Sequence, residues 1–305
     1  MPRILSLLRD ALPRLATLDR RADEIKINQG LILGELHRDK RSRRLADYEF
    51  KVFSQWGEDG ILQHLTSHLE IGHRTFIEFG VEDFFESNCR YLLVKDLWQG
   101  FVIDGSSANI ERLRRSYFYW KYPLNARASF ITRENVSSLL QESGFDRDLG
   151  ILSIDVDGVD YHLLEALGEW RAAIVVVEYN GLFGHRRSVT VPYDATFTRR
   201  RAHPSNLYWG ASLPAFDSLL RSRGYALVGV NSMSSNAFFV RRELLNDRVG
   251  EVAVDSCPSG PVFREARDAR GALTLRSAHD SRDLIAHLPL LDLESGQAIT
   301  VADVL

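Results

Sequence analysis

The sequence predicts an α/β protein built on a doubly wound, mostly parallel seven-stranded sheet. Short continuous runs of Ile, Val and Phe recur along the chain and are typical of strands buried on both faces. The segments between these runs have helical patterns and are long enough for crossover connections. The last two apolar runs are joined only by NSMSSN, which favours an antiparallel pair. We therefore expect parallel strands and an antiparallel last strand.

The expected elements alternate in order from residue 48 to about residue 242. Strands are expected within RTFIEFG (74–80) and at residues 100–104, 128–132, 149–155, 173–178, 224–231 and 235–244. Helices are expected at residues 57–69, 87–96, 108–117, 134–141, 161–167 and 212–223. The connection 180–208 is long, and such connections are often lids or binding loops.

Both ends of the chain read as extensions of a central domain. Residues 4–37 are expected to form a helix in which Pro13 introduces a kink, followed by a basic run at 38–44. From Leu8 the helix carries a heptad pattern that suits either docking on its own domain or dimerisation. The pattern comprises Leu8, Ala11, Leu15, Leu18, Ala22, Ile25, Gln29, Ile32 and Leu36. We divide the chain into the extension 1–47, the domain 48–248 and a C-terminal extension 249–305 of uncertain structure.

Composition restricts the class of protein. The formal net charge of the 305 residues is −3, which argues against nucleic acid as the main partner. The two cysteines, Cys89 and Cys257, cannot form a disulfide framework and lie in no metal-binding spacing, which favours a reducing compartment. The apolar runs are shorter than the roughly 20 residues that cross a bilayer. We therefore expect a cytoplasmic protein without a transmembrane segment.

Four of the expected strands end on acidic residues. These residues are Glu78, Asp104, the pair Asp155 and Asp157, and Glu178. In an open parallel sheet, ligands bind at the carboxyl ends of the strands. The sequence therefore predicts a ligand site at one edge of the sheet that contains several carboxylates.

The ordered set of motifs resembles the Rossmann-like class I S-adenosylmethionine-dependent methyltransferases, and among them the FkbM-like branch. The resemblance covers residues 48–242 through SQWGEDGIL, FIEFGVEDFFESNCRYLL, FVIDGS, ILSIDVDGVDYHLLEAL and VVVEYNGLFG. Members of that branch often modify sugars, polysaccharides and natural products. The resemblance implies that S-adenosylmethionine is the cofactor and that its methyl group is transferred to a hydroxyl of a small-molecule or glycan acceptor.

Several residues are candidates for holding this cofactor. Gly80 allows the backbone to turn closely beneath a ligand, and Glu78 either holds the methionine ammonium or orients the loop. Asp104 either accepts the two ribose hydroxyls or caps the following helix. The remaining candidates are Ser54, Gln55, Asn88, Gly105, Ser106, Thr132 and Asn135. Ser54, Gln55, Thr132 and Asn135 are equally suited to starting helices.

The acceptor side is expected around SIDVDGVD. On an extended strand Asp155 and Asp157 face the same side, and two neighbouring carboxylates favour a raised pKa and a role as general base. Alternatively, these two carboxylates bind a divalent cation such as Mg²⁺ with Glu178 and Asn180, since all four are oxygen ligands. His185 and His203 in the long connection are further candidates for the base, or are ordinary loop histidines.

Two other classes of protein fit the same general pattern. A protein that binds NAD or a nucleotide sugar uses a similar sheet, but this chain carries Glu82, Asp83 and Phe84 where a dinucleotide motif has glycines. A non-catalytic subunit of a glycan-synthesis complex would use the N-terminal helix to assemble with a partner. A homo-oligomer formed through the same helix is a further candidate.

Overall fold

The computed structural model describes residues 2–258 and 260–304, and the side chains of all of these except 2–16, 278 and 279. The large sheet has the strand order β3-β2-β1-β4-β5-β8-β7. Its strands are β1 (Thr75–Phe79), β2 (Gln99–Asp104), β3 (Leu124–Ala128), β4 (Asp148–Ile154), β5 (Arg171–Glu178), β7 (Tyr225–Val230) and β8 (Asn236–Arg241). Strand β8 is antiparallel to both neighbours, whereas the other pairs are parallel. The predicted fold class is confirmed.

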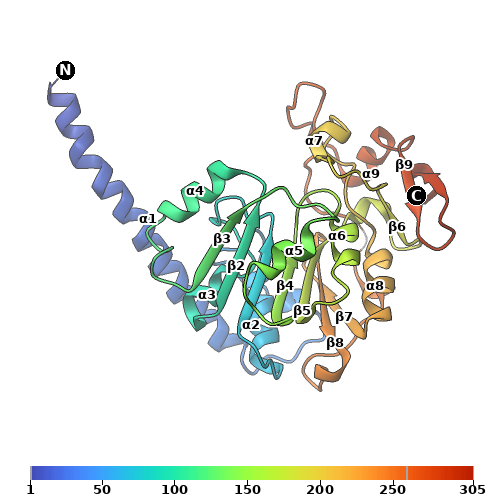
Figure 1. The fold of residues 1–305 in the computed structure, drawn as a ribbon, viewed down its shortest axis with the longest axis horizontal. Coiled ribbons are helices and arrows are strands. Elements are labelled where there is room, and N and C mark those ends of the chain that lie inside the picture. Colours follow the sequence, from blue (N-terminus) through green and yellow to red (C-terminus); the bar gives the residue numbers. More distant parts are fainter. Residues whose placement is uncertain (1, 259, 305) are drawn as a thin grey trace.

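Helices cover both faces of this sheet (Figure 1). One face packs against α2 (Glu58–His68), α3 (Arg90–Asp96) and α4 (Ser107–Arg115). The other packs against α5 (Val136–Gln141), α6 (Asp160–Ala166) and α8 (Leu213–Ser222). The central strands are mostly apolar because both of their faces are buried, as the predicted doubly wound arrangement requires.

One predicted strand was misplaced. The third strand was expected at residues 128–132 but occupies Leu124–Ala128. It lies at the edge of the sheet, where Leu124 and Ala126 are buried and Asn125 and Arg127 are exposed. The segment that looked more apolar lies outside the strand, and its Phe130 is exposed. An edge strand needs only one apolar face, so its residues alternate between apolar and polar. The apolar residues at 128–132 therefore did not mark the position of the strand.

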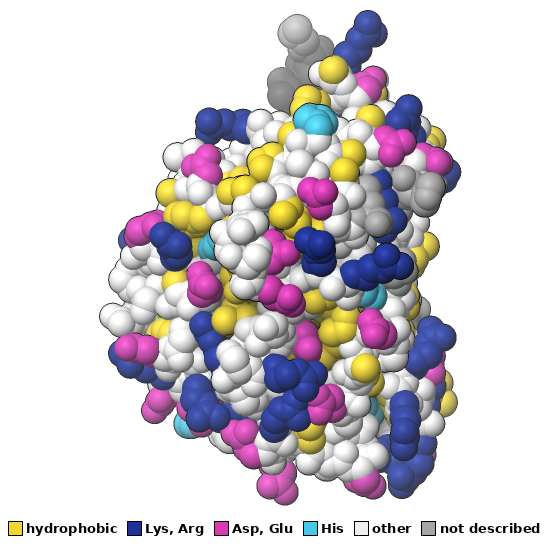
Figure 2. All heavy atoms as spheres, turned by 90° about the vertical axis from the view of Figure 1, so that its right-hand side faces the viewer, with side chains coloured by type: hydrophobic (Ala, Val, Ile, Leu, Met, Phe, Trp, Pro, Cys, Tyr) yellow, Lys and Arg dark blue, Asp and Glu magenta, His cyan; other side chains and the backbone are white. Residues whose placement is uncertain are grey.

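The C-terminal segment packs on the connection that follows β5. Strand β6 (Val189–Thr190) pairs with β9 (Pro289–Asp292), which also pairs with β10 (Ala298–Thr300) in a three-stranded sheet. The segment also includes α9 (Ala278–Ser281). A separate apolar cluster joins residues of both regions, among them Phe183, Tyr208 and Leu290. On this side of the molecule, basic and acidic side chains are intermingled, and neither charge dominates (Figure 2).

Helix α1 (Pro2–His37) is continuous, although Pro13 was expected to kink it. Its carboxyl half packs near α2 and its amino half extends away from the domain (Figure 1). A Cβ atom on Gly30 would lie 2.6 Å from Val52 Cγ2, so glycine allows this close packing. Within the part of the chain that the structure describes, no helix is long and apolar enough to cross a membrane.

Candidate functional site

A pocket of about 460 Å³ lies at the carboxyl ends of β1, β4 and β5. The chain runs from β1 towards β3 in one direction and from β4 towards β5 in the other, so the strand order reverses between β1 and β4. Ligands of doubly wound proteins bind at this switch point. The volume is in the range of sites for small molecules.

The loop after β1 forms one wall of the pocket, and Glu78 holds it in place. The Glu78 carboxylate accepts hydrogen bonds from Ser87 Oγ at 2.7 Å, from the Asn88 N–H at 2.7 Å and from the Cys89 N–H at 3.2 Å. Burial raises the pKa of Glu78. These hydrogen bonds orient the loop, which is one of the two roles expected for Glu78.

This loop has an unusual backbone. Gly80, Glu82 and Phe84 have φ values of 71°, 47° and 63°, in the left-handed region that non-glycine residues rarely adopt. A Cβ atom on Gly80 would lie 1.5 Å from the carbonyl oxygen of Asp155. Only glycine fits there, because the loop after β4 leaves no room for a side chain. Such strain is concentrated at functional sites.

Asp104 connects the first two loops. Its Oδ2 accepts from the Glu82 N–H at 2.8 Å, and its Oδ1 accepts from the Ser106 N–H at 2.7 Å and from Asn109 Nδ2 at 3.2 Å. Ser106 caps α4 by accepting from the Asn109 N–H, and Gly105 lies in the turn between them. A carboxylate accepts about four hydrogen bonds, so Asp104 retains capacity for roughly one more. That is fewer than the two ribose hydroxyls expected of it.

The SQWGEDG segment is fixed by two buried carboxylates. Asp59 Oδ2 accepts from the N–H groups of residues 52–54, each at 2.7 Å, and from Ser54 Oγ at 2.8 Å. Burial raises the pKa of Asp59 to about 6. Ser54 is fully buried in this network, whereas Gln55 lines the pocket. Ser54 Oγ also accepts from the Asp59 N–H, in the first turn of α2, at 3.1 Å, which suits the helix-starting role expected for it.

Glu58 links the same segment to the final hairpin. It accepts from the N–H groups of Trp56 and Gly57, and also from Asn231 Nδ2 at 2.7 Å and Asn236 Nδ2 at 3.0 Å. Sequence reasoning did not identify this connection, because the partners are more than 170 positions apart. The available signal was the pair of asparagines flanking the turn between β7 and β8.

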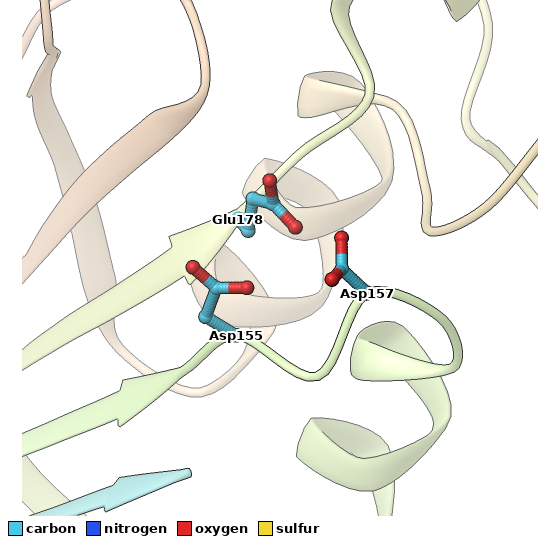
Figure 3. Close-up of side chains that lie close together, drawn as sticks. All are labelled: Asp155, Asp157 and Glu178. Carbon is cyan, nitrogen blue, oxygen red and sulfur yellow. The ribbon is translucent and has the colours of Figure 1, made fainter. Parts of the chain in front are cut away.

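Three carboxylates converge at the ends of β4 and β5 (Figure 3). One oxygen from each of Asp155, Asp157 and Glu178 lies within 4.8 Å of the others. Burial and the neighbouring carboxylates raise the pKa of both Asp155 and Glu178 well above the usual range. Glu178 Oε2 is buried and has no hydrogen-bond partner among the described residues. The arrangement suits a shared proton or a cation.

The route by which Asp157 reaches this cluster differs from the expected one. Strand β4 ends at Ile154, and Asp157 has a φ of 56°, so it is not the next-but-one residue of an extended strand. Asp160 holds the turn by accepting from the N–H groups of Val156 at 2.8 Å and Gly158 at 3.0 Å. A left-handed turn, not strand alternation, therefore brings Asp157 towards Asp155.

The Asn180 side chain, expected as one of four oxygen ligands, is engaged elsewhere. The chain leaves β5 after Glu178 and enters a 3₁₀ turn at Gly181–Phe183, which ends the strand alternation on which that expectation depended. The Asn180 side chain accepts from the Leu182 N–H at 3.0 Å and donates to the carbonyls of Leu207 and Trp209. Its amide is therefore engaged in holding the long connection, and the cluster comprises the other three expected ligands, Asp155, Asp157 and Glu178.

The long connection reaches the pocket through Arg199 in α7 (Arg199–Ala202). Its guanidinium lies 2.5 Å from Asp157 Oδ1 and also pairs with Glu265 of the C-terminal segment. It stacks over Trp209 with 4.8 Å to the ring centroid. Arg199 therefore neutralises part of the acidic cluster and joins it to the C-terminal wall.

The C-terminal segment completes the pocket. Sequence reasoning did not predict this contribution. Phe263 stacks on Trp56 with 5.8 Å between ring centroids, and both rings line the cavity. Residues Arg264, Glu265 and Leu273 line it as well. The segment is polar and lacks a regular pattern, so its contacts with residues 56 and 199 could not be anticipated.

The remaining candidates do not line this pocket. His203 Nδ1 lies 2.7 Å from Ser205 Oγ, and burial lowers the pKa of both His203 and His185. Asn135 accepts from the Thr132 N–H at 2.8 Å and donates to the Phe130 carbonyl, so the start of α5 satisfies its own polar groups. His203 and both helix-start residues are therefore engaged in local hydrogen bonds, whereas His185 Nε2 is buried without a hydrogen-bond partner among the described residues.

Comparison with known proteins identifies no specific relative. No protein-family model matches the chain, and a search of curated proteins finds no match. Among solved structures, the chain is similar to a putative O-methyltransferase from Klebsiella pneumoniae, at 10% identity over 70% of this chain and 87% of that chain, with a TM-score of 0.38.

Two further solved structures have comparable similarity. The N-terminal domain of EvdMO1, crystallised with SAH bound, matches at 10% identity over 66% of this chain and 80% of that chain, with a TM-score of 0.36. The CurJ carbon methyltransferase matches at 12% identity over 60% of this chain, with a TM-score of 0.37. The match spans about half, 52%, of the CurJ chain.

Proposed function

We propose that this protein is an S-adenosylmethionine-dependent methyltransferase that acts on a hydroxyl oxygen of a sugar, polysaccharide or natural product. The observation that carries the proposal is the acidic lining of the pocket at the switch point. Seven carboxylates line it, against two guanidinium groups. The acidic residues are Glu78, Glu82, Glu86, Asp155, Asp157, Glu178 and Glu265, and the basic ones are Arg199 and Arg264.

This charge distribution favours a cationic ligand over an anionic one. A pyrophosphate would be repelled by carboxylates and would need a glycine-rich helix start, which this chain lacks after β1. S-adenosylmethionine, when bound, supplies a methyl group on a positively charged sulfur. The motif resemblance and the strand order, with β8 antiparallel to the rest, also support this cofactor. Membership of the FkbM-like branch remains a prediction from the motifs.

The β1 loop and its neighbours would hold the cofactor. Glu78 and Asp104 keep the loop in its strained conformation, and Gln55 and Asn88 line the cavity beside it. Asp104 lies behind Glu82 and does not line the cavity itself, and it has capacity for roughly one more hydrogen bond. Because methyl transfer is an in-line displacement, this rigid positioning supplies much of the catalysis.

The acidic cluster would act on the acceptor. Asp155 and Glu178 have raised pKa values, which bring a carboxylate closer to the strength needed to remove a hydroxyl proton. The same cluster fits a divalent cation such as Mg²⁺, since its donors are all carboxylate oxygens and Glu178 Oε2 has no hydrogen-bond partner within the described residues. Asp155, Asp157 and Glu178 would hold such an ion, which lowers the pKa of a bound hydroxyl.

The opposite wall suits a sugar-like acceptor. Trp56 and Phe263 present aromatic surface, and Ser235 and Asn236 present polar groups on the same cavity. Small-molecule sites commonly combine apolar surface with a few fixed polar groups in this way. Arg199 and Arg264 add donors suited to hydroxyl or acidic groups on the acceptor.

The test is incubation with labelled S-adenosylmethionine and a panel of glycans and natural-product hydroxyls, with and without EDTA. We expect transfer of label to oxygen, and loss of at least about 100-fold in rate for Asp155→Asn. Glu169→Gln, an exposed carboxylate at the other end of β5, is the matched control and should retain activity. Methyl transfer that persists in EDTA would exclude a required cation. The role of the cluster as general base would then remain.

A non-catalytic subunit is the second candidate, and the extended amino half of α1 is the observation that favours it. This function predicts a stable partner and no label transfer with any acceptor. Detection of methyl transfer by the isolated protein would exclude it.

A further inference from the structure

Helix α1 uses one face to attach to its own domain. Asp23 pairs with Arg90 at 2.6 Å, and both side chains are almost completely buried. Tyr117 donates a hydrogen bond of 2.6 Å to the same carboxylate. Gly30 packs against Val52 and Tyr91, and Ile27 and Leu33 lie against the same apolar cluster. These contacts fix the carboxyl half of the helix and its rotation on the domain.

The opposite face carries the heptad pattern and is exposed. The exposed fractions of Leu18, Ile25, Ile32 and Leu36 are 56%, 60%, 62% and 70%. Five of the twelve large apolar side chains found exposed in the described part of the chain belong to this one helix. An exposed apolar stripe of this kind marks an interaction surface. The heptad residues whose side chains the structure describes, from Leu18 to Leu36, therefore do not contribute to docking of α1 on its own domain.

We propose that this stripe is the interface of a homodimer, in which α1 pairs in antiparallel orientation with α1 of a second copy. In the proposed register, Ala22 lies opposite Ile25 of the partner subunit. Leu18 and Ile32 continue the seam on either side, at the same heptad positions as Ile25. The inference is independent of the proposed catalytic activity, because the stripe lies on the face opposite the docking contacts.

Charges beside the seam favour this orientation. In the antiparallel register, Asp19 flanks the seam opposite Lys26 of the partner subunit, and the two-fold axis repeats the attraction. Moving the register by one heptad in either direction would bring Asp19 opposite Asp19 or Lys26 opposite Lys26. A parallel pair would instead bring Arg21 near Lys26. The charges therefore select one alignment.

The shape of the molecule favours a second copy as the occupant. The helix has 36 residues and is about 54 Å long, while only its carboxyl half packs on the domain. Antiparallel pairing lays the extended half of each helix over the exposed face of the docked half of the other. The apolar stripe of each helix is thus covered by the same surface of the other helix, as a closed two-fold dimer requires.

The experiment measures the mass of the full-length protein against concentration, by sedimentation or light scattering. We expect a dimer, and Ile32→Asp should weaken association by about 100-fold or more, since the change occurs twice per dimer. Leu31→Asp is the matched control, because Leu31 is the adjacent residue, is 44% exposed and lies outside the heptad seam. It should change the association constant by less than about threefold.

A charge exchange tests the orientation. Asp19→Lys and Lys26→Asp should each weaken the dimer, and the double exchange should restore it. A parallel dimer would instead be strengthened by Lys26→Asp alone. A monomer at all concentrations, equal effects of the Ile32 and Leu31 substitutions, or binding of the monomer to anionic phospholipid vesicles through this stripe would overturn the proposal.

Discussion

The backbone of Gly80 lies directly against the carbonyl oxygen of Asp155, so closely that a Cβ atom on Gly80 would be 1.5 Å from it. This contact joins the loops after β1 and β4, the two strands between which the direction of the chain reverses. The wall of the pocket and the acidic cluster are therefore parts of one packed unit, and a change in either loop should affect both.

Gly80→Ala should destabilise the protein by about 2–5 kcal/mol, because the methyl group both clashes with Asp155 and opposes a φ of 71°. Chemical denaturation measures this change. Gly72→Ala is the control, since a Cβ atom there contacts nothing within 4 Å, and its effect should stay within about 0.5 kcal/mol. Equal stability of the two variants would show that the loops separate readily.

The pair Asp155 and Glu178 should make the stability of the protein fall as the pH rises. Their pKa values are raised by folding, so above the ordinary carboxyl pKa of about 4 the folded state binds more protons than the unfolded state. The stabilising contribution is present at acidic pH and is lost as the pH rises through the raised values.

Asp155→Asn combined with Glu178→Gln should remove this contribution. The free energy of unfolding of the double variant should decrease less between about pH 5 and pH 8 than that of the unchanged protein. Urea denaturation in EDTA across this pH range measures how the free energy of unfolding changes with pH in both proteins. Identical slopes would mean that the two carboxyl groups titrate normally in the folded protein.

Asp23→Ala should destabilise the protein by about 3–5 kcal/mol, because it leaves the buried Arg90 guanidinium without its carboxylate. Arg90 also stacks on Phe53 and Phe118, with 4.0 Å and 4.2 Å to the ring centroids. Adding Arg90→Met should recover part of the loss. Glu24→Ala, at an adjacent exposed position, should have little effect. Similar values for the Asp23 and Glu24 variants would contradict the docking described for α1.

Arg199→Ala should loosen the C-terminal wall of the pocket. The substitution removes the contacts to Asp157 and Glu265, and charge-assisted hydrogen bonds of this kind contribute about 1.5–3 kcal/mol. Hydrogen exchange of residues 262–266 should therefore become faster, whereas Arg200→Ala, at an exposed neighbouring position, should leave it unchanged. Unchanged exchange in the Arg199 variant would mean that other contacts hold the wall.

The sheet was predictable because its central strands are buried on both faces and read as continuous apolar runs. The edge strand β3 was misplaced because one of its faces is polar. Glu78 and Asp104 were identified as important, but most of their observed partners are backbone N–H groups of nearby loops, which depend on backbone turns and not on residue type.

The parts of the site that were missed depend on contacts between distant segments. Trp56 stacks on Phe263, which is more than 200 positions later in the chain. Asp157 accepts a hydrogen bond from Arg199, which is more than 40 positions later. No local pattern encodes these pairs. Asn180 was misassigned for a related reason, since the strand ends at Glu178 and strand alternation cannot be extended into the 3₁₀ turn.

The most direct test of the central claim is calorimetric titration of the protein with S-adenosylhomocysteine and, separately, with NAD. We predict saturable binding of S-adenosylhomocysteine at one site per chain and no binding of NAD at the same concentrations. Glu169→Gln should bind like the unchanged protein. Binding of NAD without binding of S-adenosylhomocysteine would contradict the assignment of the pocket to a methyl donor.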